Sequence, residues 1–215
     1  MTSDFPTLLK MAASAHGHLC PGMVLGVRMG ILGLAMLGYD APLDDRSIKN
    51  VVVFVEIDRC AADALATVTG VKLGRRSLKF RDYGLMAATF LHLPDNRAIR
   101  ISAGEGSREK ALAMYPDVPD KYAREVRAYQ ELAASDLFKV EEVRVELDPM
   151  DLPGHGQPKE FCEECGTVIR HGRHVELNGR KVCQVCAGDA YFERVAPIGD
   201  IDRLDPVGDK GEHHV

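Results

Sequence analysis

The chain has 215 residues, of which 46% are hydrophobic and 27% charged, and its formal net charge is −5. This composition is typical of a globular protein with a substantial core, so it argues against a chain that is disordered throughout. The acidic balance also lacks the basic face that sequence-independent nucleic-acid binding requires, so we expect no nucleic-acid partner.

The sequence has no segment that is typical of a membrane span or an export signal. Its longest apolar stretch, Pro21–Gly38, is interrupted by Arg28 and by several glycines, which makes it a poor membrane-spanning helix. No signal-peptide pattern is visible. We therefore expect a cytoplasmic protein with no membrane partner, in which six cysteines serve as metal ligands or reactive thiols rather than as disulfides.

Predicted helices and strands are mixed along the body of the chain. In chain order they are a helix at Phe5–Ala13, a helix at Pro21–Leu37, a strand at Val51–Ile57, a helix at Cys60–Thr69, strands at Ser77–Arg81, Met86–Leu93 and Ala98–Ser102, helices at Ser107–Tyr115 and Lys121–Ala134, and a strand at Phe138–Leu147. The composition of Met86–Leu93 would also suit a helix. Because most strand connections look like hairpins, we expect an α+β fold with a mixed helix and antiparallel-sheet core, not a doubly wound sheet.

Prolines and glycines divide the chain near residue 150. Three prolines and two glycines between residues 148 and 160 can continue neither a helix nor a central strand. We therefore expect a core domain over residues 1–148, a linker over 149–160, a four-cysteine zinc finger over 161–195 and an irregular tail over 196–215.

Four cysteines near the end of the chain form two CxxC pairs with 17 residues between them. They are Cys162, Cys165, Cys183 and Cys186. Four thiolates complete a closed tetrahedral zinc site, which is the favoured interpretation; a redox dithiol pair and an iron–sulfur cluster are the alternatives. A hairpin turn at Asn178-Gly179 and a helix-like run from Ala187 to Arg194 predict a treble-clef or zinc-ribbon module.

The simplest role for this module is to hold together a segment that is too small to form a core alone. The alternative is that it docks a protein or nucleic acid, but Glu163, Glu164 and Glu176 partly offset its basic residues. Because all four ligands are thiolates, the metal has no open position for catalysis.

A second group of metal-ligating side chains lies near the start of the chain. His16, His18 and Cys20 fall within five residues, just before the helix expected at Pro21. The start of a helix stabilises a thiolate, which is the form that a nucleophile or a metal ligand requires. Cys60 follows a strand and also begins a helix, so we expect Cys20 and Cys60 to face each other across a cleft. Either cysteine is a candidate catalytic nucleophile, although a single cysteine is more often a buried, inert residue.

Small residues line one side of the helix expected at Pro21–Leu37. Gly22, Gly26 and Gly30 are spaced four residues apart and make a smooth helix face. Such a face favours close helix packing, either inside the subunit or across a dimer.

These segments together resemble the FmdE-like proteins, a family named after a component of formylmethanofuran dehydrogenase. The resemblance rests on His16-Gly-His-Leu-Cys-Pro-Gly22, on Glu56 to Asp63 with Thr69 to Arg75, on Asp82-Tyr-Gly84 and on the four-cysteine module. It implies an α+β core with an auxiliary treble-clef zinc finger, a homodimer, and a link to molybdenum- or tungsten-dependent enzymes. It also implies a core metal site of His16, His18, Cys20 and Cys60, with Asp63 nearby.

Three functions compete on these observations. The first is a metal-binding accessory or regulatory protein, with structural zinc in the module and a second transition metal in the core, that serves a molybdenum or tungsten enzyme partner. The second is a metal- or cysteine-dependent enzyme in which Arg75, with Arg76 and Asp63, binds a small anionic substrate. The third is a zinc-finger regulator that binds nucleic acid, against which the acidic balance counts.

Overall fold

The computed structural model describes residues 4–154 and 159–196, and the chain divides into two compact units, Met1–His155 and Gly156–Val215. This division falls within the expected linker. The expected tail lies outside the described residues apart from Ala196. No helix of the described residues is long and apolar enough to cross a membrane.

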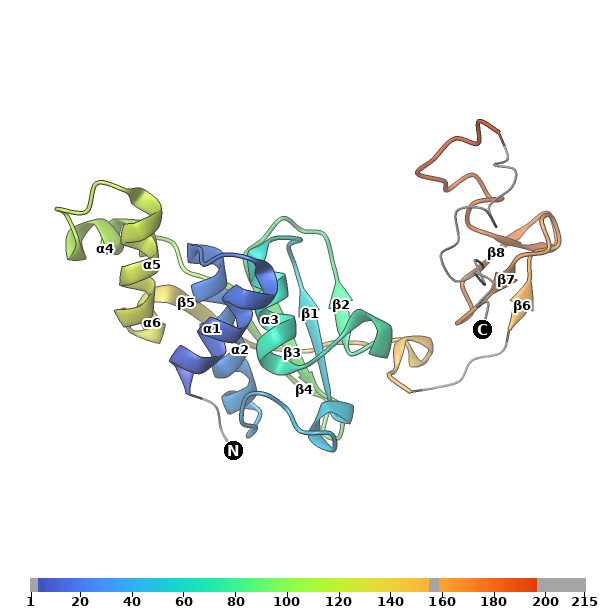
Figure 1. The fold of residues 1–215 in the computed structure, drawn as a ribbon. Coiled ribbons are helices and arrows are strands. Elements are labelled where there is room, and N and C mark those ends of the chain that lie inside the picture. Colours follow the sequence, from blue (N-terminus) through green and yellow to red (C-terminus); the bar gives the residue numbers. More distant parts are fainter. Residues whose placement is uncertain (1–3, 155–158, 197–215) are drawn as a thin grey trace, which may run out of the picture. The chain divides into compact units, whose positions relative to one another are not determined.

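The first unit contains helices and a five-stranded sheet, so the predicted α+β class is confirmed (Figure 1). Its elements are α1 (Phe5–His16), α2 (Pro21–Met36), β1 (Val51–Val55), α3 (Cys60–Thr69), β2 (Leu78–Phe80), β3 (Ala87–His92), β4 (Arg97–Ala103), α4 (Ser107–Met114), α5 (Lys121–Glu131), α6 (Ala134–Leu137) and β5 (Phe138–Val143). Each predicted element is present, and Met86–Leu93 contains a strand rather than a helix. The helix expected at Lys121–Ala134 is two helices, because extended backbone at Leu132 ends α5.

The strand order of the sheet is β2-β1-β3-β4-β5. All pairs are antiparallel except β1 and β2, which are parallel. The hairpin expectation is therefore right for β3–β4 and wrong for β2–β3, because β1 lies between these two strands. Parallel neighbours need a crossover connection, and α3 provides it.

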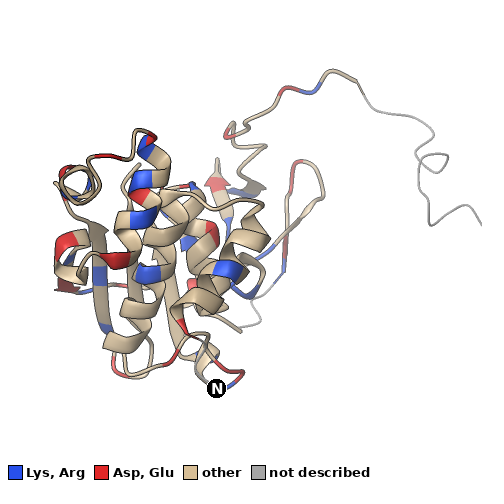
Figure 2. Cartoon of the chain, turned by 60° about the vertical axis from the view of Figure 1, so that its left-hand side comes forward, with Lys and Arg blue, Asp and Glu red and all other residues tan. Residues whose placement is uncertain are grey.

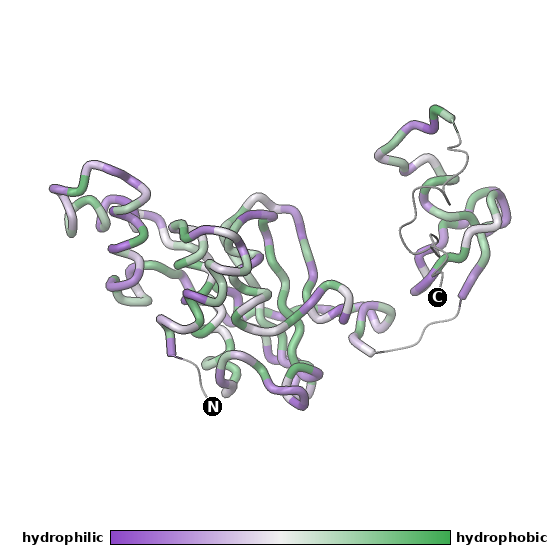
Figure 3. The backbone as a smooth tube through the Cα atoms, viewed as in Figure 1, coloured by the Kyte–Doolittle hydropathy of each residue, from purple (hydrophilic) through white to green (hydrophobic). Residues whose placement is uncertain are grey.

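The hydrophobic residues of β1 and β3 are green in Figure 3, and their side chains are buried on both faces of the sheet. On one face Val53, Phe90 and Ile101 pack with α1, α2 and α3. The other face carries a smaller cluster, Val52, Phe54, Leu91 and Ala98, on which Val145 and Leu147 pack. The segment after β5 thus covers the sheet face that the helices leave open.

This covering segment, residues 144–152, is also attached to β2 at the far edge of the sheet. The Arg76 guanidinium lies 2.9 Å from a carboxylate oxygen of Asp151. Lys79 Nζ donates a hydrogen bond of 2.7 Å to the Asp151 carbonyl. We call residues 144–152 the strap.

The glycine face of α2 packs inside the subunit. A Cβ atom at Gly26 would lie 2.7 Å from the Ala61 carbonyl oxygen of α3, and one at Gly33 would lie 2.4 Å from the Phe90 ring of β3. Real Cβ contacts are longer, so only glycine allows this approach. Close packing of α2 on α3 sets the positions of the two helix starts, where Cys20 and Cys60 lie.

The second unit has two small antiparallel hairpins, β6 (Glu160–Phe161) with β7 (Val168–Ile169) and β8 (His174–Leu177) with β9 (Arg180–Cys183). The expected turn at Asn178-Gly179 joins β8 to β9, and both residues have positive φ. The helix expected at Ala187–Arg194 is wrong. A single turn follows β9 and ends where Gly188 adopts φ +98°. The described residues of this unit therefore contain two short hairpins and lack the helix that the treble-clef expectation placed after Cys186.

Charged residues of both signs are interspersed over the ribbon of the first unit (Figure 2). Many form pairs, such as the bidentate pair of Arg100 with Glu56 at 2.7 and 2.8 Å.

Candidate metal centres

The four cysteines of the second unit lie together and form what we call the four-cysteine cluster. The sulfur atoms of Cys162, Cys165, Cys183 and Cys186 all lie within 4.8 Å of one another. The Cys183 N–H donates to the Cys162 sulfur at 3.2 Å, and the Cys186 N–H donates to the Cys183 sulfur at 3.4 Å. Backbone donors aimed at sulfur favour thiolates, so the cluster is able to hold a metal ion.

The thiols of this cluster differ strongly in pKa. Backbone hydrogen bonds, chiefly from Cys183, lower the pKa of Cys162 to about 6. Hydrogen bonds with the sulfurs of Cys183 and Cys165 raise the pKa of Cys186 to about 12. Neighbouring thiolates repel one another, so four of them at this spacing need a cation among them.

Four side chains of the first unit form a second group, which we call the core cluster. One donor atom from each of His16, His18, Cys20 and Cys60 lies within 4.8 Å of the other three. Cys20 and Cys60 therefore lie close together, as the sequence predicted. His18 is exposed and Cys20 is buried.

Three helix ends create this convergence. Gly17, with φ +99°, ends α1 directly after His16. Cys20 is the N-cap of α2, and Cys60 is the first residue of α3. A Cβ atom at Gly22 would lie 3.3 Å from Cys60 Cβ and 3.8 Å from the Cys20 sulfur. Glycine at position 22 thus allows the two cysteines to approach, and both thiols lie at positive helix ends.

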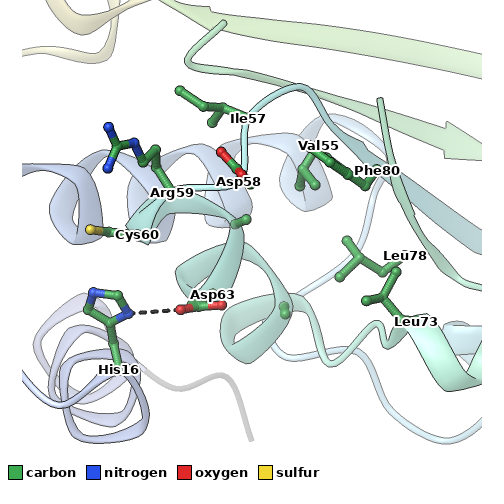
Figure 4. A pocket seen from close by; sticks show the side chains of 12 residues that line it. His16, Val55, Ile57, Asp58, Arg59, Cys60, Asp63, Leu73, Leu78 and Phe80 are labelled. Atoms are coloured by element: carbon green, nitrogen blue, oxygen red, sulfur yellow. Dashed lines mark hydrogen bonds and ion pairs between the residues drawn. The ribbon is translucent and has the colours of Figure 1, made fainter. Parts of the chain in front are cut away.

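A carboxylate orients the His16 ring. Nδ1 of His16 lies 2.8 Å from a carboxylate oxygen of Asp63, which is the dashed line in Figure 4. The other nitrogen, Nε2, is buried and has no hydrogen-bond partner among the described residues. A carboxylate that accepts from one ring nitrogen leaves a lone pair on the other, which is the usual arrangement of a metal-binding histidine. This orphaned nitrogen fits a metal ion in the core cluster.

The protein groups around the Cys60 thiol do not activate it for attack. Burial raises its pKa, and the neighbouring Cys20 sulfur raises it further. A catalytic cysteine needs a lowered pKa, because the thiolate is the nucleophile. A bound cation would reverse this effect by stabilising the thiolate.

A cavity of about 470 Å³ opens beside the core cluster. His16, Cys60 and Asp63 belong to its wall. Its other lining residues are Val55, Ile57, Asp58, Arg59, Ala62, Ala66, Leu73, Leu78 and Phe80. Sequence analysis singled out only the first three, although Arg59 adjoins Cys60 and the alternation of Leu78 with Phe80 indicates a shared strand face.

The expected substrate-binding arginines lie elsewhere. Arg75 is exposed and is not among the described residues that line this cavity. Arg76 is bonded to Asp151 of the strap. The structure therefore brings Asp63, but neither arginine, to the wall beside the core cluster.

Comparisons found proteins that are similar to this chain in sequence and in fold. A protein of Archaeoglobus fulgidus named probable S-adenosyl-L-methionine-binding protein is 26% identical over 205 residues, which cover 88% of this chain and 55% of that protein. The chain thus spans about half the length of that curated relative. The crystal structure of a tungsten formylmethanofuran dehydrogenase FmdE-like protein from Syntrophus aciditrophicus has a similar fold. Its TM-score is 0.59 at 17% identity, and the match covers 90% of this chain and 100% of that one.

The sequence model of a family described as FmdE, molybdenum formylmethanofuran dehydrogenase operon, matches residues 15–146. The match covers more than half of the chain and includes the whole core cluster. The chain therefore belongs to the FmdE family.

Proposed function

We propose that this FmdE protein binds two metal ions, a structural zinc ion in the four-cysteine cluster and a transition-metal ion in the core cluster. We further propose that it is an accessory or regulatory protein of molybdenum- or tungsten-dependent formylmethanofuran or formate-type dehydrogenase metabolism. The observation that carries the core site is the convergence of four donors with His16 Nε2 buried and unsatisfied.

The donor types favour particular ions. Four thiolates favour zinc in a closed tetrahedral site, which is a structural role. The core cluster combines imidazole and thiolate, which suits zinc and other borderline or soft ions and disfavours magnesium and calcium. An ion bound there would act as a Lewis acid. Asp63 would hold His16 in the tautomer that presents Nε2, and the starts of α2 and α3 would stabilise the two thiolates.

The proposed context rests on the family description, which names a formylmethanofuran dehydrogenase operon. The expected homodimer and the expected molybdenum or tungsten enzyme partner remain predictions. Light scattering of the purified chain tests the first, and co-purification with the tagged chain from its native cells tests the second.

A second candidate function is a metal-dependent enzyme that acts on a small molecule. The observation that favours it is the cavity of about 470 Å³, whose wall includes His16 and Cys60 of the core cluster. A structural ion needs no such cavity beside it, whereas a reacting ligand does.

Metal analysis of the full chain and its variants tests the proposal. We expect two ions per chain in the wild type and one in either Cys60→Ser or Cys162→Ser. The matched control is His92→Gln, which removes another histidine paired with a carboxylate, Asp95 at 2.7 Å, outside both clusters. This control should keep both ions. One ion per chain, retained in Cys60→Ser and lost in Cys162→Ser, would contradict the core site.

A further inference from the structure

We propose that the cavity beside the core cluster binds a small organic molecule with one metal-binding end and an apolar body. The inference rests on the proposed core metal site and adds to it the class of ligand. The donor end would reach the ion from the side of His16 and Cys60, and the body would lie against Leu73, Leu78 and Phe80.

The position of the cavity is the first argument. His16 and Cys60 belong both to the core cluster and to the cavity wall, so a molecule in the cavity lies against the metal ligands. In Figure 4 these two side chains lie at one end of the site, and Leu73, Leu78 and Phe80 lie at the other. A ligand that spans the site therefore meets donor atoms at one end and hydrocarbon at the other.

The apolar wall is the second argument. Leu73 is 66% exposed and Phe80 is 40% exposed, although both are large hydrophobic side chains. Covering such surface is favourable because it removes hydrocarbon from water. The strand period places Leu78 and Phe80 on the same side of β2, while Lys79 between them is bonded to the strap. Lys79 therefore attaches β2 to the strap, and it is not among the described residues that line the cavity.

Charge is the third argument, and it disfavours polyanions. Among the described residues that line the cavity, Arg59 brings one cation and Asp58 and Asp63 bring two carboxylates. Asp63 is engaged with His16. A nucleotide or a phosphate ester carries several negative charges and is usually bound by several cations, whereas this wall offers one guanidinium beside two carboxylates. A ligand with a single donor end and an uncharged body fits this wall.

The experiment uses the full chain loaded with Co²⁺, whose visible bands report the donors around the ion. Acetohydroxamate, butyrohydroxamate and hexanohydroxamate are titrated in turn, because they share one metal-binding end and differ in the length of the tail. We expect each probe to shift the cobalt bands that Cys60→Ser removes. We expect the affinity to rise about fourfold for each methylene added.

Two leucine variants test whether the alkyl tail of the hydroxamate lies against Leu73. Leu73→Ser removes apolar surface from the cavity wall, and Leu112→Ser is its control on α4, at 49% exposure and outside the cavity. Leu73→Ser should bind acetohydroxamate with the affinity of the wild type, which would show that the metal site is intact. Its affinity should increase much less than that of the wild type as the tail of the hydroxamate becomes longer. Leu112→Ser should keep that gain.

Two failures are distinguishable. If the cobalt bands are the same in Cys60→Ser, the proposed core metal site is wrong. If the bands depend on Cys60 but the affinity is independent of tail length, or if Leu73→Ser leaves the length dependence intact, the core metal site stands and the inferred ligand class is overturned.

Discussion

The two clusters of potential metal ligands differ in charge. A divalent ion with four thiolates has a net charge of −2, whereas the same ion with two thiolates and two neutral imidazoles has a net charge of zero. The negative charge of the first arrangement disfavours a further anionic donor, whereas a neutral ion is able to accept and polarise one if its coordination expands from four to five. In the function proposed above, the ion of the four-cysteine cluster stabilises a fold, and the ion of the core cluster is the one that a further ligand would contact.

The two clusters also differ in how the chain builds them. The four-cysteine cluster is local, since two CxxC turns and the hairpins around them supply all four sulfurs. The core cluster needs α1, α2 and α3 to end or begin at one place, with a glycine at position 22 to bring the cysteines together. In the core cluster, Asp63 contacts the ring of a histidine ligand, and two of the four ligands belong to the wall of a cavity.

The largest expected effect is that of Cys162→Ser. Metal binding supplies the folding energy of small zinc modules, about 10–16 kcal/mol in zinc-finger peptides, so the module should lose both its ion and its fold. Hydrogen exchange should show lost protection over residues 159–196 and unchanged protection in β1 and β3. A single cooperative loss of structure in both units would contradict this separation.

Acidification should release the ion of the four-cysteine cluster. The pKa of Cys186 is raised to about 12, so its thiol is protonated at pH 7 and must lose that proton to bind metal. The apparent affinity should therefore fall at least about tenfold per pH unit as the pH decreases from 9 to 6. The fall should become steeper near pH 6, where Cys162 also takes up a proton. Zinc competition with a chelator at several pH values measures this slope, and a flat profile would contradict it.

Asp63→Asn should weaken the core site alone. Loss of an outer-shell carboxylate lowers metal affinity by about 10–100-fold, because the ligand ring is no longer held in its tautomer and orientation. The matched control is Asp58→Asn, which changes another carboxylate of the same cavity wall and leaves the bond between Asp63 and His16 in place. Cobalt titration compares the two variants; equal affinities would argue against the orienting role of Asp63.

Gly26→Ala should have the smallest effect on metal binding and should again act only on the core site. Its Cβ atom would lie 2.7 Å from the Ala61 carbonyl oxygen, so α2 must shift away from α3. Overpacking of this kind costs about 1–3 kcal/mol, and the shift should lower the core metal affinity severalfold. Gly74→Ala is the control, since its Cβ atom meets nothing within 4 Å. Thermal unfolding and cobalt titration test both variants.

Local signals in the sequence predicted most of the elements. Pro21 and Gly38 bracket α2 as expected, and Gly70 ends α3 where a left-handed residue is needed. The core cluster was predictable for the same reason. Cys20 and Cys60 each begin a helix, where a thiolate is stabilised, and this position marked both residues as candidates before their contact was known.

Long-range contacts set the features that the sequence did not reveal. The parallel pairing of β2 with β1 depends on the path of α3 across the sheet, which no local pattern encodes. Arg75 lies next to the cavity in sequence but outside its wall in space, whereas Leu73, two residues earlier, lines it. The expected helix after Cys186 failed because Gly188, at φ +98°, limits the chain to one turn.

The strap has a consequence for where the first unit can be cut. The family match ends at residue 146, yet the anchor of β2 is Asp151, which holds both Arg76 and Lys79. A fragment that ends at residue 146 would keep all four donors of the core cluster. It would lose the contacts of Asp151 with Arg76 and Lys79, and Lys79 belongs to the strand that contains Leu78 and Phe80. A truncated first unit that keeps these contacts must therefore extend to residue 151, several residues past the end of the family match.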